Sequence, residues 1–318
     1  MTHKVKIIDS FDKSFLLSAI NILEEDGVVI LRGFFENNII ETLVNSWKVY
    51  FKKPSISGAL GYYRTSHPKA VLPAFLLGQP ALRIALEKRV LSIIEGYMKS
   101  DCTLAEANAV WHKATSYVYF PLHSDFCKGW KKTKKMNYSV SSTDLKEPLG
   151  VGGMFYMHDT QEGALKYSLG SHKLYSSYGQ HLKNYPMKMQ NTILKNVVKC
   201  FGKKGDIILF DDRGFHGPDQ PSNLDRSVLL LDYYRNKTFG SVVVTPHLTN
   251  ITDLSILNSK QMKVLGLKAS YLVAPEEYDK TRFKKNIFYN FIAQLTDKSF
   301  LFHHIKDIIK SKIYLKKY

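Results

Sequence analysis

Between residues 102 and 245 the sequence is a series of short apolar and aromatic runs, with turn residues and no helical periodicity between them. Short strands at this spacing are typical of an antiparallel β sandwich or barrel, because a parallel sheet would need helical segments between its strands. The pattern therefore predicts a central β core. Its expected strands are 109–112, 116–120, 138–141, 154–157, 164–168, 193–199, 207–210, 228–234 and 241–244.

Helical periodicity lies on both sides of this core. Gly27 is placed to end the first helix, a short apolar strand follows at 28–31, and 54–68 has the composition of a loop. We expect a domain of helices and β core over 1–250 and a helical extension over 251–318. The expected helices cover 13–26, 37–50 and 80–99 and, after the core, segments beginning near Asp253, Pro275 and Phe300.

The composition excludes two classes of protein. Hydrophobic residues make up 44% of the 318 residues and aromatic residues 13%, which is typical of a folded domain and not of a disordered chain. No apolar run approaches the roughly 20 residues that span a bilayer, and the charged N-terminus lacks the apolar segment of a signal peptide. The three cysteines show no paired spacing. We expect them to be reduced thiols in a cytoplasmic protein.

The formal net charge of +17 indicates an anionic partner. Most of the 45 basic residues are lysine, whereas nucleic-acid interfaces usually use arginine for base contacts and planar stacking. A positive surface also raises the encounter rate of small anions. We therefore expect an acidic small molecule as the partner before nucleic acid. The oligomeric state stays open.

A His-x-Asp pair, His123 and Asp125, follows one of the expected strands. Residues i and i+2 of a strand point to the same face, so both side chains can reach one metal ion. His216, from a distant strand, would complete a set of two imidazoles and one carboxylate, which binds ferrous iron and leaves positions open. Zinc also occurs with three protein ligands, and a lone His-x-Asp pair is more often structural. The pair by itself is weak evidence.

Arg226 lies ten residues after His216 and opens the apolar run 228–231, so its guanidinium can point into the β core. A buried arginine needs an anionic partner. The distal carboxylate of 2-oxoglutarate would supply one through paired N–H donors. A structural salt bridge to Asp225 or Asp232 explains the position equally well.

Three ordered segments of the chain resemble the phytanoyl-CoA dioxygenase family of iron(II)- and 2-oxoglutarate-dependent oxygenases. They are 123–126 (HSDF), 162–173 (EGALKYSLGSHK) and the block from Gly205 to His216 followed by Arg226. The first is close to the form found in ectoine hydroxylases. The N-terminal strand and helix over 27–50 also resemble the opening of that family. The likeness covers about residues 10–240.

This resemblance implies a double-stranded β-helix, a jelly-roll or cupin-like core flanked by N- and C-terminal helices. His123, Asp125 and His216 would hold Fe(II), and Arg226 would anchor the cosubstrate 2-oxoglutarate. With O2, the family's oxidative decarboxylation yields succinate and CO2 and drives hydroxylation of a substrate. Asp125 favours hydroxylation over halogenation, because halogenating relatives replace this carboxylate with a small residue and bind chloride there.

The chain departs from the family at two positions. Pro218 stands where many relatives have a serine that helps the arginine to hold 2-oxoglutarate, and Leu169 replaces a proline. We expect either that Tyr117 or Ser222 supplies the missing hydroxyl or that the cosubstrate pocket is altered.

Two lysine-rich segments fall outside this metal-site pattern. The loop 128–135 follows the His-x-Asp pair directly, and Lys128, Trp130 and Lys131 are candidate contacts for a phosphorylated or carboxylated substrate, although a solvated loop is slightly favoured. Residues 299–318 have the pattern of a basic amphipathic helix. Such a helix binds weakly to an anionic membrane surface or, more commonly, packs on the core.

The leading interpretation is a dioxygenase that hydroxylates a small or conjugated, anionic organic substrate. One alternative keeps the same iron site but ends in desaturation, cyclisation or epimerisation. Another is a non-catalytic basic β sandwich that binds an anionic ligand or nucleic acid. An intact set of metal ligands argues against the binding module, which has no need of it.

Overall fold

The core of the protein is formed by two β sheets that face each other. The computed structural model describes residues 4–52, 69–130, 139–175, 178–239 and 253–267. The larger sheet has the strand order β1-β2-β8-β5-β10-β4-β3, and the smaller has β7-β6-β9. The strands are β1 (Ile7–Asp9), β2 (Val28–Arg32), β3 (Lys69–Pro73), β4 (Cys102–His112), β5 (Gly150–Tyr156), β6 (Leu165–Ser168), β7 (Val197–Cys200), β8 (Ile207–Asp211), β9 (His216–Pro218) and β10 (Arg226–Arg235).

All strand pairs are antiparallel except that of β1 with β2. Apolar residues from the inner faces of the two sheets pack together, Met154 and Val228 from the large sheet against Leu165 and Tyr167 from the small one. This arrangement is the predicted jelly roll with flanking helices. Because side chains alternate along a strand, one set of β10 residues points between the sheets and the other points outward.

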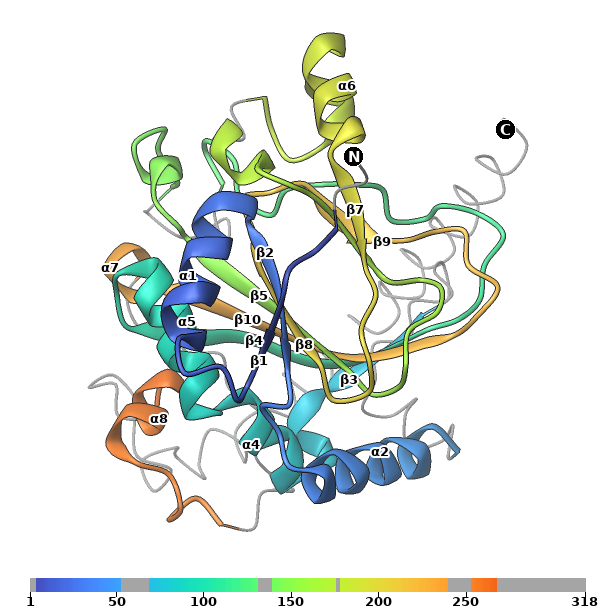
Figure 1. Ribbon diagram of the computed structural model, residues 1–318, viewed down its shortest axis with the longest axis vertical. Helices are drawn as coiled ribbons and strands as arrows, with labels where there is room; N and C mark the ends of the chain where they lie inside the picture. Colours follow the sequence, from blue (N-terminus) through green and yellow to red (C-terminus); the bar gives the residue numbers. More distant parts are fainter. Residues whose placement is uncertain (1–3, 53–68, 131–138, 176–177, 240–252, 268–318) are drawn as a thin grey trace, which may run out of the picture.

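A layer of helices covers the outer face of the large sheet (Figure 1). Outward residues of β10 such as Leu229, Leu231 and Tyr233 are fully buried in a cluster with apolar residues of these helices. The helices are α1 (Phe15–Asp26), α2 (Asn37–Lys52), α4 (Gln79–Ala85), α5 (Lys88–Met98) and α8 (Ser259–Val264), with α6 (Met187–Lys195) and α7 (Asn236–Phe239) elsewhere. Burial of this apolar layer supplies the main free energy of folding.

Two expected elements are wrong in type or extent. The single helix expected over 80–99 is two helices, because the chain turns at Leu86 and the Glu87 side chain accepts a hydrogen bond from the amide of Arg89 at the start of α5. The strand expected over 193–199 is the end of α6 followed by β7, since Ile193 is buried as a helical residue in a small apolar cluster. A helix therefore lies within the β region.

The strand expected over 116–120 does not form. The side chain of Gln220 accepts hydrogen bonds from the amides of Tyr119 and Phe120, at 3.2 Å each, which satisfies donors that a strand partner would otherwise take. Residues 139–141 are likewise not a strand. The sequence analysis also missed β1, β3 and β9.

Residues 253–267 pack on the helical layer. Val264 and Leu265 are buried in the main core, and the side-chain amide of Gln261 donates to the carbonyl of Leu86 at 2.9 Å. Asn258, and not the expected Asp253, caps α8. The domain division at 250 stays a prediction. The expected loop 54–68, residue 138, strand 241–244 and the helices after Pro275, 299–318 included, lie outside the described residues.

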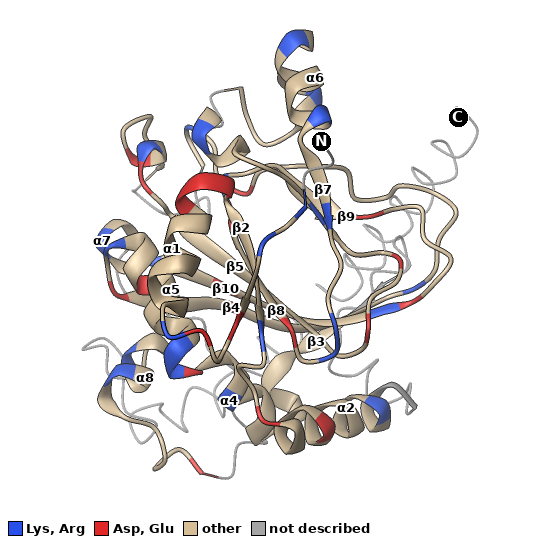
Figure 2. Cartoon of the chain, in the orientation of Figure 1, with Lys and Arg blue, Asp and Glu red and all other residues tan. Residues whose placement is uncertain are grey.

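Among the described residues, no helix is long and apolar enough to cross a bilayer. Basic residues occur on α2, α6 and α8 as well as in loops, so in this part of the chain they do not gather on one element (Figure 2).

The turn at Gly27 joins α1 to β2 and should tolerate no side chain. Gly27 has φ +81°, and a Cβ there would lie 2.4 Å from the Tyr167 hydroxyl and 2.5 Å from Nδ1 of His172. Gly27→Ala is expected to lower the free energy of unfolding by about 1–3 kcal/mol more than Gly129→Ala. Gly129 has the same φ with no atom within 4 Å of its Cβ position. Urea titration of both variants measures the difference; equal losses would mean that backbone strain alone acts.

Candidate metal centre

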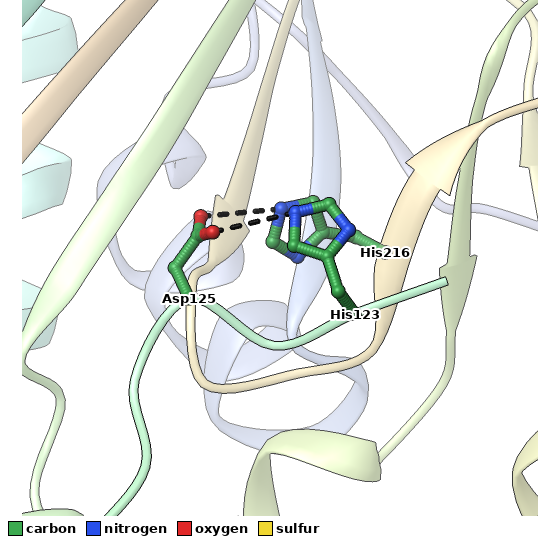
Figure 3. A group of neighbouring side chains, drawn as sticks. All are labelled: His123, Asp125 and His216. Atoms are coloured by element: carbon green, nitrogen blue, oxygen red, sulfur yellow. Dashed lines mark ion pairs between the residues drawn. The ribbon is translucent and has the colours of Figure 1, made fainter. Parts of the chain in front are cut away.

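His123 and His216 face each other across an isolated antiparallel bridge that joins the segment of His123 to the start of β9. The amide of His123 donates to the carbonyl of His216 at 3.0 Å, and the reverse bond is 2.9 Å long. Asp125 is fixed nearby, because its amide donates to the carbonyl of Asp212 at 2.9 Å. These main-chain bonds bring together the three residues that the sequence pattern predicted as metal ligands (Figure 3).

The three side chains converge through their ligand atoms. Nε2 of His123 lies 3.3 Å from Oδ1 of Asp125, and Nε2 of His216 lies 3.3 Å from Oδ2. One ligand atom of each residue lies within 4.8 Å of the others. The His216 side chain is 8% exposed and that of His123 14%, whereas the Asp125 side chain is 41% exposed. The two imidazoles therefore lie on the buried side of the centre, and the carboxylate lies on the side that is accessible to solvent.

The other nitrogen of each imidazole is held by a main-chain carbonyl. Nδ1 of His123 lies 3.0 Å from the carbonyl of Pro121, and Nδ1 of His216 lies 3.0 Å from that of Gly214. A carbonyl can only accept, so Nδ1 carries a hydrogen in both rings, and each Nε2 faces Asp125, where it can bind a metal once it has released its proton. Metal-binding histidines commonly have this outer hydrogen bond, which fixes the tautomer and the ring orientation.

The electrostatics favour the charged carboxylate. Burial opposes ionisation of Asp125, but the imidazoles of His216 and His123 outweigh it and hold the pKa of this carboxyl well below its usual range. Burial likewise lowers the pKa of His216, and the Asp125 carboxylate outweighs this effect and raises it. A divalent cation would take the place of the shared protons. Two imidazoles and a carboxylate fit Fe(II), and they also fit zinc.

Two aromatic rings pack on the imidazoles from the protein side. The ring centroid of Phe120 lies 4.5 Å from that of His123, and the centroid of Phe210 lies 4.7 Å from that of His216. These contacts restrict the rotation of both ligands. Phe210 is buried and shields His216 from water, whereas Phe120 is 40% exposed.

Arg226 is buried in the jelly-roll interior without a carboxylate partner. It is 2% exposed, its Nε has no hydrogen-bond partner among the described residues, and its Nη1 donates to Sδ of Met154 at 3.8 Å. Burial lowers the pKa of Arg226, opposed by the phenols of Tyr156 and Tyr119. An unpaired buried guanidinium is costly. It is the feature that an anionic cosubstrate would neutralise.

The salt bridges considered for Arg226 do not form among the described residues. Asp225 instead accepts hydrogen bonds from the indole of Trp111 at 2.9 Å and the amide of Ala114 at 2.7 Å. Asp232 lies on the same strand as Arg226, β10, three positions further along the row of side chains that point between the sheets.

The positive charge of Arg226 acts on the phenol of Tyr119, a residue that the sequence analysis missed. Its hydroxyl lies 2.7 Å from Nδ1 of His112, the residue paired with Arg226 on the adjacent strand. By contrast, Tyr117 is 41% exposed. Ser222 is buried, but its hydroxyl donates to the carbonyl of Leu224 at 2.9 Å. Roles for Tyr117 and Ser222 stay predictions.

The candidate substrate contacts fall into different surroundings. Lys128 is exposed, and Lys131 lies outside the described residues. Trp130 packs against Phe126 with 4.8 Å between centroids, and against Tyr234 and Phe239 at 6.1 and 5.8 Å. Trp130 belongs to an aromatic cluster at the end of β10. Any substrate contact made by Trp130 would therefore depend on the neighbouring rings as well.

Asp211 and Asp212 were interpreted as turn residues, and both are buried. Asp211 forms an ion pair with Arg213, 2.6 Å from Nη2. Asp212 has no such partner, and burial, followed by the carboxylates of Asp232 and Asp125, raises its pKa well above its usual range. The expected structural role of His172 agrees with its position, buried with Nε2 3.2 Å from the carbonyl of Glu24.

No family model and no curated protein matches the sequence. Solved structures match the fold. EctD from S. alaskensis with 2-oxoglutarate and 5-hydroxyectoine has a TM-score of 0.55 and 15% identity, covering 72% of this chain and 79% of that one. EctD from S. alaskensis with bound Fe has a TM-score of 0.54 and 14% identity, covering 72% and 80%. The epimerase SnoN in complex with Fe3+, alpha ketoglutarate and nogalamycin RO has a TM-score of 0.50 and 14% identity, covering 70% and 85%.

At these identities the likeness establishes the jelly-roll fold. Of these structures, one EctD contains 2-oxoglutarate, the other contains Fe, and SnoN contains Fe3+ and alpha ketoglutarate.

Proposed function

We propose that the protein is an Fe(II)- and 2-oxoglutarate-dependent dioxygenase of the phytanoyl-CoA dioxygenase type that hydroxylates a small or conjugated organic molecule. One observation carries this proposal. A metal-ligand set with both Nε2 atoms aimed at a carboxylate shares the jelly-roll interior with a buried arginine that lacks an anion. Iron would occupy the first feature, and the distal carboxylate of a dicarboxylate cosubstrate would pair with the second.

Each residue has a definite task in this function. His123, Asp125 and His216 would hold the iron, which with 2-oxoglutarate and O2 supplies the oxidising power for attack on a C–H bond. Arg226 would bind the distal carboxylate of 2-oxoglutarate through charge-assisted N–H bonds. Tyr119 is placed to donate a further hydroxyl, in the role that serine has where Pro218 stands here. The buried ring of Phe210 would keep water from the inner side of the centre.

The supporting measurement is a visible absorption band on anaerobic addition of Fe(II) and 2-oxoglutarate. We expect wild-type protein to show it, and His216→Ala to lose it together with about 100-fold or more of its 2-oxoglutarate turnover, since one of three ligands is gone. His181→Ala is the matched control, because His181 lies opposite His123 on another isolated bridge but is exposed and outside the ligand set. A wild-type protein without the band would favour the binding module.

Epimerisation is the second candidate outcome. It draws support from the epimerase SnoN, whose structure shares this fold and contains Fe3+ and alpha ketoglutarate. Asp125 is compatible with both outcomes. Product mass separates them, because hydroxylation adds one oxygen and epimerisation leaves the mass unchanged.

A further inference from the structure

Asp125 is the metal-ligand candidate with the most exposed side chain. Its side chain is 41% exposed, whereas those of His123 and His216 are 14% and 8% exposed. Each imidazole is also held at Nδ1 by a main-chain carbonyl and packs against an aromatic ring. The Asp125 carboxylate instead faces the two Nε2 atoms, where a metal ion would bind (Figure 3). Its position therefore depends on how firmly the main chain of Asp125 is held.

Two other segments hold the main chain of Asp125. Its amide donates to the carbonyl of Asp212 at 2.9 Å, and its carbonyl accepts a hydrogen bond from the side-chain amide of Gln180 at 2.7 Å. A carbonyl can only accept, so the nitrogen of the Gln180 side chain, and not its oxygen, faces Asp125. The main-chain carbonyl of Gln180 also accepts a hydrogen bond from the amide of Ser124 at 2.9 Å. Gln180 thus binds the chain on both sides of the peptide bond between Ser124 and Asp125.

Gln180 belongs to a segment that also contacts the chain next to both histidines. The residue after it, His181, pairs with His123 across an isolated bridge. Further along the segment, the buried ring of Tyr185 packs against Phe215, the residue before the second histidine, with 5.0 Å between ring centroids. The segment that carries Gln180 is therefore placed against the chain of all three ligand candidates.

We propose that Gln180 is a positioning residue, which holds Asp125 where its carboxylate can bind the metal ion. This inference rests on the proposed function, since it concerns the same metal centre. A ligand whose main chain is already fixed loses less conformational freedom when the metal binds, so the hydrogen bond from Gln180 raises metal affinity. Loss of an outer hydrogen bond around a metal site typically weakens metal binding by about 10–100-fold.

Gln190 provides a matched control. Like Gln180, it is partly buried, and its side-chain amide donates to a main-chain carbonyl, that of Tyr185, at 2.7 Å. This carbonyl belongs to no member of the candidate ligand set. Methionine has a similar length to glutamine and lacks the N–H donors. Gln180→Met and Gln190→Met therefore each lose a hydrogen bond of the same kind and length.

The test measures the binding of Co(II) alone to the metal-free full-length protein, by calorimetry and by the visible absorption of the bound ion. Gln180→Met is expected to weaken Co(II) binding by at least about tenfold. At saturating Co(II) the spectrum of this variant is expected to differ from that of wild type, because the carboxylate is no longer held in the same place. Gln190→Met is expected to keep both the affinity and the spectrum of wild type.

Thermal melting of the metal-free protein separates positioning from a general loss of stability. Both variants lose one hydrogen bond, so they are expected to melt at similar temperatures, slightly below wild type. If the two variants bind Co(II) equally well, or if Gln180→Met has the wild-type spectrum at saturation, the inference is overturned. The proposed function fails by a different result, a wild-type protein that binds Co(II) but shows no band with Fe(II) and 2-oxoglutarate, so the two failures are distinguishable.

Discussion

Arg226→Met is expected to raise the dissociation constant of 2-oxoglutarate by about 100-fold or more without lowering the stability of the cosubstrate-free protein. Truncating one partner of a buried charge pair costs roughly 2–5 kcal/mol of binding. In the free protein the guanidinium is buried and its Nε is unpaired, so methionine of similar length removes a cost. Anaerobic calorimetry with Fe(II) and 2-oxoglutarate, and thermal melting of the free protein, measure the two effects.

Arg226→Lys is the control for charge alone. Lysine keeps the positive charge but lacks the planar pair of N–H donors, so we expect an affinity between those of wild type and Arg226→Met. A large fall in melting temperature of Arg226→Met, with unchanged 2-oxoglutarate binding, would mean that Arg226 is a structural residue and that the cosubstrate is held elsewhere or not at all.

The metal-ligand candidates could be predicted from the sequence because their chemistry is local. His123 and Asp125 are two residues apart, and His216 lies in a recognisable block, so residue type and order suffice. Their outer hydrogen bonds could not be predicted, since they go to the main-chain carbonyls of Pro121 and Gly214, which any sequence would offer.

The surroundings of Arg226 depend on strand register. Tyr119 meets His112 because its segment folds back beside β4, and His112 meets Arg226 only through the pairing of β4 with β10. A single sequence does not fix register between strands more than a hundred residues apart, so these residues remained unassigned.

Two expected elements, the strand 116–120 and the single helix 80–99, were wrong because a side chain accepts hydrogen bonds from their main-chain amides. Gln220 binds the amides that would have made 116–120 a strand, and Glu87 caps α5 where the apolar pattern runs on through both helices. Burial continues through both helices of 80–99, whereas the apolar side chains of 116–120 are largely exposed, with Val118 at 51%. The fold class was predicted because many segments carried the same signal.

Arg213 and Arg226 are both buried and allow a direct comparison. Both are at most 4% exposed, but Arg213 donates to Asp211 from Nε and Nη2 and to the carbonyl of Leu145 at 2.8 Å, whereas Arg226 meets no carboxylate. A guanidinium with all these partners stabilises the native state, whereas one without them is available to bind an anionic ligand. Their variants should therefore change stability in opposite directions.

Arg213→Met is expected to lower the free energy of unfolding by about 3–5 kcal/mol, because it leaves the carboxylate of Asp211 buried without its cation. Tyr97 donates to the same carboxylate at 2.5 Å and can compensate only in part. Denaturant titration at neutral pH measures the loss. The double variant Arg213→Met/Asp211→Asn removes both charges and is expected to recover most of it. A single variant as stable as wild type would contradict the role of this pair.

The same ion pair should contribute to the acid sensitivity of the fold. Burial opposes ionisation of Asp211, but Arg213 outweighs it and lowers the pKa of the carboxyl in the folded state. The pair's contribution is therefore complete above the unfolded aspartate pKa of about 3.9 and is lost as pH falls through the lower folded pKa. Between about pH 5 and pH 2 the double variant should lose less stability than wild type. Parallel curves over this range would show that Asp211 carries no charge in the native protein and that the stability of the pair is not electrostatic.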